Sequence, residues 1–322
     1  MLDTEKLKVL IPQQILSEGI NYLTTLGYEV THGSGFDELA IIDSIKDCSA
    51  ILIRNAQITK KVIDAAPKLR VIARHGVGVD NIDVAYATER GIWVTNAPES
   101  NYNAVAEHTI MVLLALAKNL LINSEAFAKG DFNVRHRIIN NEVKGKVLGV
   151  VGYGRVGKEV SKKAFYGLDM EVLVFDPFVK KEELPNFVNH SETLEHLFAT
   201  SDYITLHLPS NPLTKEIINY NYLKLMKKSA YLINAARAEI VSENDLIEIL
   251  SNNLIAGAAL DVFKEDPPDY NSPLFKLSNI IFTPHNAAHT HEAFLKMALD
   301  AGQGIYEVFE GKRPTWPVNN VN

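Results

Sequence analysis

The chain has 322 residues, of which 47% are apolar and 22% charged, and its formal net charge is −7. At roughly 150 residues per domain, this length predicts about two domains, and the composition is that of a globular protein rather than a disordered or repetitive one. An acidic chain with no basic run longer than two residues argues against nucleic-acid binding, which needs clustered Lys and Arg.

The sequence predicts neither a membrane partner nor a secretory leader. Its longest uninterrupted apolar stretch, Ile110 to Ala117, is far shorter than the ~20 residues of a membrane span. The first residues, MLDTEKLKVLIPQQ, mix acids and bases and lack a long apolar region. The single cysteine, Cys48, excludes an internal disulfide and is interpreted as a small structural residue. A cytoplasmic location is therefore expected.

In the first hundred residues, short β-rich runs alternate with helical patterns. Leu39, Ile42 and Ile45 are spaced as one face of a helix. This alternation predicts βαβ units and a parallel sheet. The expected strands are Lys8–Ile11, Glu29–Thr31, Ala50–Ile53, Val71–Ala73 and Trp93–Thr95.

A long apolar segment follows. From Ala104 to Gly130 the sequence is typical of one continuous helix that is apolar on most sides, with Asn103 as a candidate N-cap. Such a helix must be buried, either between domains or in a subunit interface.

A second alternating set occupies the rest of the chain, so the fold class is α/β, with doubly wound parallel sheets. We find no internal repeat, and the tail from Gly311 is too rich in Pro and Asn for a core element. The expected strands of this set are Val147–Val151, Glu171–Phe175, Tyr203–Leu206, Tyr231–Ile233, Gly257–Leu260 and Ile280–Phe282.

The stretch KVLGVVGYGRVG, from Lys146 to Gly157, runs from an apolar strand directly into a GxGxxG pattern. Helix-compatible residues follow, and the next expected strand leads to Asp176, nineteen residues beyond Gly157. Gly152 permits the tight turn, Gly154 lets a diphosphate approach the backbone, and Gly157 allows close helix packing. This context predicts dinucleotide binding; a flavin or other nucleotide site is the alternative.

The acid that follows the second strand bears on the choice of cofactor. Asp176 is placed to accept hydrogen bonds from a ribose diol and to repel a 2′-phosphate, which favours NAD over NADP. Lys180 and Lys181 keep NADP open. Arg155 is expected to close over the diphosphate from the side, beside Val156 at the start of the helix.

Three further segments carry ionisable groups directly after expected strands, at the edge where open parallel sheets bind ligands. They contain Arg237, then Asp261 with Asp266, and then His285. Taken alone, an Arg after a strand is usually a solvated surface group, and a His beside Pro is usually a turn residue. Three such segments in one sheet with a dinucleotide loop predict a catalytic site, and they include no metal-ligand pattern.

Taken in order, these motifs resemble those of the D-2-hydroxyacid dehydrogenase family, which contains D-3-phosphoglycerate, hydroxypyruvate/glyoxylate and D-lactate dehydrogenases. The resemblance covers nearly the whole chain. It implies two Rossmann-like domains: a discontinuous substrate domain of residues 1–101 and 288–322, and an NAD-binding domain of residues 102–287. The matching segments are HGVGVDNID (75–83), NAPESNYNAVAEHT (96–109), GKVLGVVGYGRVGKEV (145–160), LHLPSNPLT (206–214), INAARAEIV (233–241), ALDVFKEDP (259–267) and TPHNAAHTHEA (283–293).

The family implies a role for each ionisable group. Arg237 would bind the substrate carboxylate and carbonyl oxygen, and His285 would give its proton to that oxygen as hydride arrives at carbon. The family has a Glu that pairs with the His, and here Asp266 stands in its place. Asp266 is one methylene shorter, and a longer contact would weaken the pair; the role is assigned to Asp266, with Glu265 as the less favoured substitute.

The resemblance also assigns binding residues. Arg54 would bring a cation toward the far end of the substrate, and the backbone of Val77, Gly78 and Val79 would receive its carboxylate. Ala238 replaces the family's usual Gly, which puts the turn that presents Arg237 in doubt. The implied cofactor contacts are Gly152, Gly154, Arg155, Val156, Gly157, Asp176, Ala235, Ala236, Arg237, Asp261, His285, Ala287 and Ala288; of these, Asp261 would bind the nicotinamide carboxamide.

The expected function is NAD-dependent hydride transfer between nicotinamide and a D-2-hydroxyacid or 2-oxoacid, with a D-3-phosphoglycerate dehydrogenase-like activity preferred. A hydroxypyruvate/glyoxylate reductase, or another 2-oxoacid reductase, is the alternative. A non-enzymatic NAD-sensing corepressor is disfavoured because the catalytic positions are filled, and formate oxidation because Asp266 is an acid. As in the family, the apolar helix after Asn103 predicts a homodimer; otherwise that helix is intramolecular core.

Overall fold

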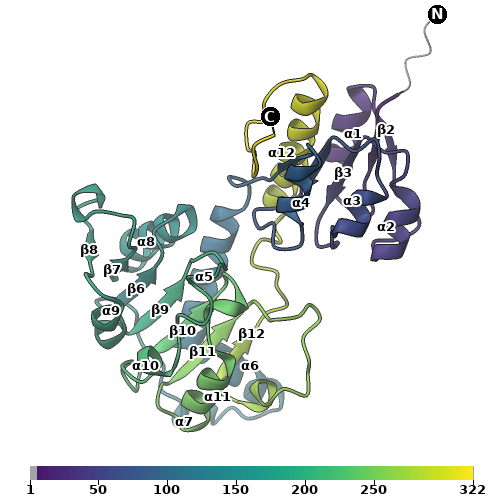
Figure 1. Ribbon diagram of the computed structural model, residues 1–322. Helices are drawn as coiled ribbons and strands as arrows, with labels where there is room; N and C mark the ends of the chain where they lie inside the picture. Colours follow the sequence, from purple (N-terminus) through teal and green to yellow (C-terminus); the bar gives the residue numbers. More distant parts are fainter. Residues whose placement is uncertain (1–5, 322) are drawn as a thin grey trace, which may run out of the picture. The chain divides into compact units, whose positions relative to one another are not determined.

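A computed structural model describes residues 6–321 of the chain. The chain divides into two compact units: unit 1 is residues 1–101 with 289–322, and unit 2 is residues 102–288 (Figure 1). Ala288, expected to open the returning C-terminal piece, belongs to unit 2.

Unit 1 contains a five-stranded parallel sheet in the order β2-β1-β3-β4-β5. Every expected strand forms here, with a difference of one residue at the end of two of them. The strands are β1 (Lys8–Leu10), β2 (Glu29–Thr31), β3 (Ala50–Ile53), β4 (Val71–Arg74) and β5 (Trp93–Thr95).

Helices cover both faces of this sheet, because both faces of its strands are apolar. Val9 packs with α1 (Ser17–Thr25) and α12 (His291–Phe309), whereas the next residue, Leu10, points to the opposite cluster. That cluster includes residues of the helices α2 (Glu38–Ser44), α3 (Lys60–Asp64) and α4 (Val84–Glu89).

The expected face of α2 is wrong at one position. Ile45 is fully buried and Ile42 partly buried, but Leu39 is 76% exposed. Ile41, which is fully buried, packs in the core instead of Leu39.

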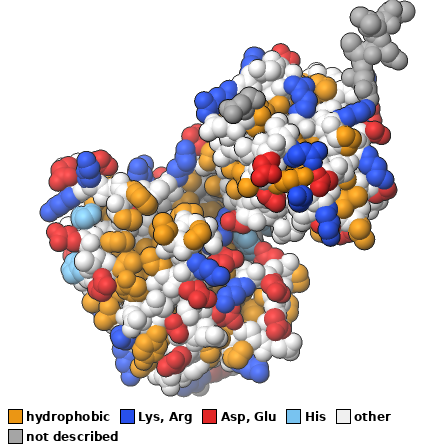
Figure 2. Space-filling view, in the orientation of Figure 1, with side chains coloured by type: hydrophobic (Ala, Val, Ile, Leu, Met, Phe, Trp, Pro, Cys, Tyr) orange, Lys and Arg blue, Asp and Glu red, His pale blue; other side chains and the backbone are white. Residues whose placement is uncertain are grey.

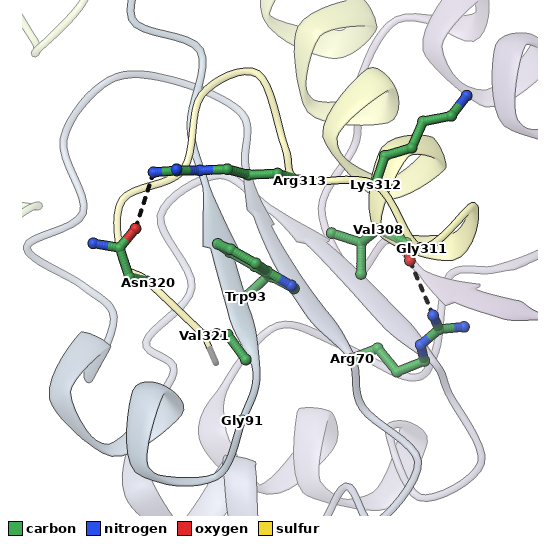
Figure 3. A pocket seen from close by; sticks show the side chains of 9 residues that line it. All are labelled: Arg70, Gly91, Trp93, Val308, Gly311, Lys312, Arg313, Asn320 and Val321. Carbon is green, nitrogen blue, oxygen red and sulfur yellow. Dashed lines mark hydrogen bonds between the residues drawn. The ribbon is translucent and has the colours of Figure 1, made fainter.

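The C-terminal tail covers the edge of β5 rather than entering the core. Val318 N donates to Val94 O at 2.8 Å, which extends the pairing of the sheet. Figure 3 shows the Trp93 ring between the side chains of Arg313 and Arg70, beside a hollow of about 700 Å³. Both arginines make structural contacts there: Arg313 donates to Asn320 Oδ1, and Arg70 donates to Val308 O near the end of α12.

Unit 2 contains a seven-stranded parallel sheet in the order β12-β11-β10-β9-β6-β7-β8. All six expected strands form. One further strand, β8, was not predicted, because its three residues include an Asn and a His and show no apolar periodicity. The strands are β6 (Val147–Val151), β7 (Glu171–Phe175), β8 (Val188–His190), β9 (Tyr203–Leu206), β10 (Tyr231–Asn234), β11 (Gly257–Leu260) and β12 (Ile280–Phe282).

This second sheet is also covered on both faces. Two long helices, α5 (Tyr102–Ala117) and α8 (Arg155–Leu168), belong to one apolar cluster. The other cluster includes residues of the shorter helices α9 (Leu194–Thr200), α10 (Tyr220–Leu223) and α11 (Glu243–Ser251), together with the 3₁₀ turns η2 (Ala238–Ile240) and η3 (Pro273–Lys276). A further 3₁₀ turn, η1 (Lys181–Glu183), follows β7.

The expected single helix from Ala104 to Gly130 is wrong. The segment forms α5 and a second helix, α6 (Leu120–Ala128), which meet at 62°. Asn119 adopts a left-handed conformation (φ 46°) at the break, which ends the helical hydrogen bonding. Asn103 is not a cap, because α5 begins one residue earlier; its side chain instead donates to Glu107. A four-residue helix, α7 (Val134–Arg137), follows α6.

Within residues 6–321, no single helix is both long and apolar enough to cross a bilayer. In this range only α5 and α6 taken together reach the required length and composition, and they are bent at the break between them. Acidic and basic side chains are interspersed over the face shown in Figure 2.

Candidate active site

The strand order of unit 2 defines where a ligand should bind. The chain moves outward from β6 through β7 to β8, and then returns to the other side of β6 as β9. In such sheets the ligand crevice lies at the carboxyl ends of the strands, where the order reverses. Gly152 follows β6 and His207 follows β9, and a Cβ on Gly152 would lie 2.8 Å from the His207 carbonyl oxygen. These two loops therefore meet at the switch point.

The three glycines of the phosphate loop differ in what surrounds them. Gly152 has φ +93°, which an L side chain rarely adopts. A Cβ on Gly157 would lie 2.2 Å from the Gly152 carbonyl oxygen, so α8 packs directly on the loop. A Cβ on Gly154 would meet nothing within 4 Å. Gly154 is the N-cap of α8 and offers no side-chain cap, so this helix start is open to a diphosphate.

Asp176 lies directly after β7, and its carboxylate bonds to the backbone of two loops, the one after β6 and the one after β7. Its Oδ2 accepts from Tyr153 N at 2.7 Å, and its Oδ1 accepts from Phe178 N at 2.9 Å. Each carboxylate oxygen retains a lone pair for a ribose hydroxyl. The backbone N–H groups at the start of α8, the open space around Gly154 and the Asp176 carboxylate together fit a dinucleotide. Arg155 and Val156 begin α8 beside them.

The loop after β10 carries Arg237 and is held by a buried amide. Asn234, 2% exposed, accepts from Ala236 N at 3.0 Å and donates to Arg237 O at 2.9 Å. The Arg237 guanidinium donates to Ala236 O at 2.7 Å, with Ala235 between the strand and this turn. Ala238 opens the 3₁₀ turn η2. That conformation suits alanine, so the departure from Gly does not disturb the turn.

The loops after β11 and β12 place the Asp266 carboxylate beside the imidazole of His285. His285 Nδ1 donates to Asp266 Oδ2 at 2.6 Å, and both side chains are about half exposed. The structure therefore pairs His285 with Asp266, while the neighbouring Glu265 is exposed. The shorter aspartate therefore reaches the imidazole at hydrogen-bond distance, and the pair is not weakened by a longer contact.

His285 itself has a constrained backbone. Its φ is +51°, in the left-handed region where non-glycine residues are uncommon. Asp261, 3% exposed, holds the two residues that follow: Oδ1 accepts from Asn286 N and Oδ2 from Ala287 N, both at 2.9 Å. Ala288 then ends unit 2. Asp261 is thus an acceptor for the backbone that presents His285.

Four aromatic rings anchor the loop that carries Asp266. Phe275 of η3 lies at the centre, with ring centroids 5.6 Å from Phe263, 4.8 Å from Phe282 and 5.3 Å from Tyr270. Since Phe282 ends β12, this cluster connects the Asp266 loop to the strand that leads to His285.

Unit 1 has its own switch point, between β1 and β3. Arg54 lies there, directly after β3. The Gln13 side chain, from the loop after β1, accepts from the backbone N–H groups of Arg54, Asn55 and Ala56 at 2.9–3.0 Å. The Arg54 guanidinium lies 4.8 Å from the Phe294 ring centroid and donates to a loop carbonyl, and its burial lowers its pKa.

The loop after β4 contains the expected backbone receptor, Val77 to Val79. Asn96 donates to Val77 O at 2.8 Å, and Arg74 Nε donates to Gly78 O at 2.9 Å. His75, 3% exposed, precedes the loop, and its Nε2 has no hydrogen-bond partner among the described residues. Burial, with Arg54 and Arg74 nearby, lowers the pKa of His75 to about 4.

Several polar residues that bond to these loops were not predicted. Gln13, Asn234, Thr283 and His108 lack the spacing of a catalytic motif; Thr283 Oγ1 bonds to Asp261 Oδ1 and lies within hydrogen-bond distance of His108 Nε2. The signal available was weak: an amide at the end of an apolar strand, and a His within an apolar helix. Within residues 6–321, no group of three or more His, Cys, Asp or Glu side chains is arranged to hold a metal ion.

The fold and this site define a two-unit, dinucleotide-binding α/β protein. Residues 110–287 match the family model described as D-isomer specific 2-hydroxyacid dehydrogenase, NAD binding domain. The chain is 38% identical over 317 residues to the D-3-phosphoglycerate dehydrogenase of Methanocaldococcus jannaschii, covering 98% of this chain and 60% of that relative.

Two further similarities extend over whole proteins. The glyoxylate reductase of Pyrococcus furiosus is 35% identical, with 98% of this chain and 96% of that protein covered. The crystal structure of a Thermus thermophilus protein superposes with a TM-score of 0.90 at 30% identity, covering 97% of this chain and all of that one. The chain belongs to the D-isomer specific 2-hydroxyacid dehydrogenase family.

Proposed function

We propose that the protein is an NAD-dependent oxidoreductase that transfers hydride between nicotinamide and a D-2-hydroxyacid or 2-oxoacid. The observation that carries this proposal is the His285–Asp266 pair, at 2.6 Å, on the same sheet edge as the phosphate loop. Arg237 follows β10, two strands from β12, so the loops of the two groups are separated by roughly 10 Å. That spacing accommodates a small 2-oxoacid between them.

Each side chain has a defined task in this proposal. Arg237 binds the substrate carboxylate through its planar set of donors and orients the carbonyl. His285 gives the carbonyl oxygen a proton in reduction and takes it back in oxidation. Asp266 stabilises the charged imidazole. The nicotinamide would supply or accept the hydride, and Asp261 is the residue that would hold its carboxamide.

The two units divide the binding. Unit 2 holds NAD through the phosphate loop, Asp176 and the Ala235–Ala236 and Ala287–Ala288 turns. Unit 1 holds the substrate through Val77–Val79, with Arg54 at its far end. Arg54 is the cation that would meet a phosphate, which favours D-3-phosphoglycerate over a smaller hydroxyacid.

The alternative substrate is hydroxypyruvate or glyoxylate. It is favoured by the contacts of Arg54, whose guanidinium already faces Phe294 and a backbone carbonyl. A substrate without a phosphate needs no second cation, and Arg54 then has a purely structural role.

A substrate panel tests the proposal and separates these alternatives. NADH oxidation is followed with 3-phosphohydroxypyruvate, hydroxypyruvate, glyoxylate and pyruvate, with NADPH in parallel. R54A should raise the KM of the phosphorylated substrate and leave that of glyoxylate unchanged if Arg54 binds phosphate. Cofactor binding without turnover of any 2-oxoacid would contradict the enzyme assignment and favour a non-catalytic NAD sensor.

A homodimer through α6 is part of the proposal. None of the residues of α6 is buried in the chain, and Leu120, Leu121, Ile122 and Phe127 are 48–62% exposed. Contiguous exposed apolar surface of this kind is typical of a subunit interface. L121E should therefore give monomers in sedimentation, whereas L39E, at an exposed leucine of unit 1, should not. We also propose a cytoplasmic location, which the single buried Cys48 supports.

A further inference from the structure

His108, a polar residue of the apolar helix α5, contacts the loop that carries His285. Its side chain is only 10% exposed. Its Nε2 lies 3.1 Å from Thr283 Oγ1, and Thr283 Oγ1 lies 2.6 Å from Asp261 Oδ1. A chain of three side chains therefore runs from α5 through the start of the loop to the end of β11.

The chemistry of the three groups fixes the direction of these hydrogen bonds. Asp261 accepts two backbone N–H groups and acts as an acceptor only, so the single hydroxyl proton of Thr283 points to it. The Thr283 oxygen must then accept from His108, which carries its proton on Nε2. Burial lowers the pKa of His108, with Asp261 opposing the shift, and so favours the neutral ring with one such proton.

The network constrains the loop at both ends of its turn. Thr283 precedes His285 by two residues, and Asp261 holds the two residues that follow it. His285 lies between these fixed points in a left-handed conformation, which a loop retains only when its surroundings enforce it. The alternative is that His108 merely fills space. A space-filling role would not require the His108 imidazole to direct an N–H at Thr283.

We propose that His108, acting through Thr283 and Asp261, is a positioning residue that sets the backbone, and hence the ring orientation, of His285. This inference rests on the proposed function for its catalytic consequence, but not for its structural one. His108 touches no reacting atom and transfers no proton. It limits how far the loop of residues 283–287 departs from the geometry in which the imidazole meets the substrate oxygen.

Paired substitutions test the proposal. H108L removes the donor at similar volume, and H108Q restores an N–H within reach of Thr283. T283V removes the hydroxyl, and T283S keeps it. The matched control is T109V: Thr109 is fully buried on the same helix, but its hydroxyl donates only to Val105 O, at 2.8 Å. Turnover of a 2-oxoacid with NADH is measured together with amide hydrogen exchange of residues 283–288.

H108L and T283V should lower kcat about 10- to 100-fold, the usual cost of a small misplacement of a reacting group. The KM of NADH should change by less than about twofold, since the phosphate loop is untouched. H108Q and T283S should recover most of the lost kcat. Exchange at Asn286 and Ala287 should accelerate in H108L and T283V, while T109V should match the wild type in both measurements.

Two results would overturn the inference: kcat and exchange in H108L equal to those of T109V, or H108Q as slow as H108L. If the wild type turns over no 2-oxoacid, the proposed function fails. The exchange data then still decide whether His108 holds the loop. If H108L does not fold, T283V against T283S decides in its place.

Discussion

Replacing Asp266 by Asn isolates the charge of the His285 partner. Asn retains an oxygen that can accept from His285 Nδ1 in the 2.6 Å geometry, so the orientation of the ring is preserved. Only the negative charge is lost. The substitution therefore removes an electrostatic attraction to the charged imidazolium and leaves the neutral ring nearly unaffected.

The size of the effect follows from the exposure of the pair. The side chains of His285 and Asp266 are 48% and 44% exposed, so their interaction is screened. With charge centres ~4 Å apart, the attraction is ~1 kcal/mol in water and ~4 kcal/mol at an effective dielectric constant near 20. Half exposure places it near the lower limit, at about 1–2 kcal/mol, which corresponds to about a 5- to 30-fold change in a rate constant.

The two directions of the reaction provide an internal check. In oxidation the imidazole becomes charged as it takes the proton, so D266N, which no longer stabilises that charge, should lower kcat at hydroxyacid saturation by about 5- to 30-fold. In reduction the charged ring gives up the proton, so the lost attraction does not raise the barrier and kcat at 2-oxoacid saturation should fall by less.

E265Q is the matched control, because Glu265 is adjacent, exposed and equally charged. Its kcat should equal that of the wild type in both directions. The assignment of Asp266 would be refuted if E265Q lowered kcat of oxidation and D266N did not. An equal fall of kcat in both directions in D266N would mean that Asp266 acts on ring geometry rather than on charge.

Four further predictions follow from local contacts. Gly157→Ala places a Cβ 2.2 Å from the Gly152 carbonyl oxygen and should lower the unfolding free energy by about 2–3 kcal/mol in urea. Gly154→Ala meets open space and should leave stability unchanged while weakening NADH binding in fluorescence titrations. Asp176→Asn should reduce the NADH-over-NADPH preference in kcat/KM about tenfold or more, because the repulsion of a 2′-phosphate is lost; an unchanged ratio would exclude that role. Burial lowers the pKa of His75 to about 4, so on acidification the unfolded chain takes up the proton before the folded one does. The free energy of unfolding should therefore fall by up to ~3 kcal/mol between pH 6.5 and pH 4, and by less in H75L.

The elements that the sequence predicts well are those set by local chemistry. The strand into the GxGxxG loop, the helix after it and the acid at the end of the next strand follow from residue type and spacing, and the structure contains all three. Polar residues directly after buried strands identify a sheet edge. This is why Arg237 and His285 could be located without coordinates.

The parts that were missed depend on contacts distant in sequence. The break at Asn119 has no Pro or Gly to mark it, and Asn is among the few non-glycine residues that adopt its left-handed conformation. The partner of the Arg54 backbone, Gln13, comes from another loop 41 residues earlier. Similarly, 175 residues separate His108 from Thr283. No periodicity in one segment reports such a pairing.

The distribution of these contacts has a consequence for the evolution of specificity. The groups that orient His285, namely Asp266, Asp261, Thr283 and His108, all lie in unit 2, together with the phosphate loop. The residues proposed to bind the substrate, Arg54 and Val77–Val79, lie in unit 1. Under the proposed function, substitutions in unit 1 would therefore change the acid that is bound and leave the groups around His285 intact. This separation offers a physical reason why proteins named phosphoglycerate dehydrogenase and glyoxylate reductase are similar to the same chain at 38% and 35% identity.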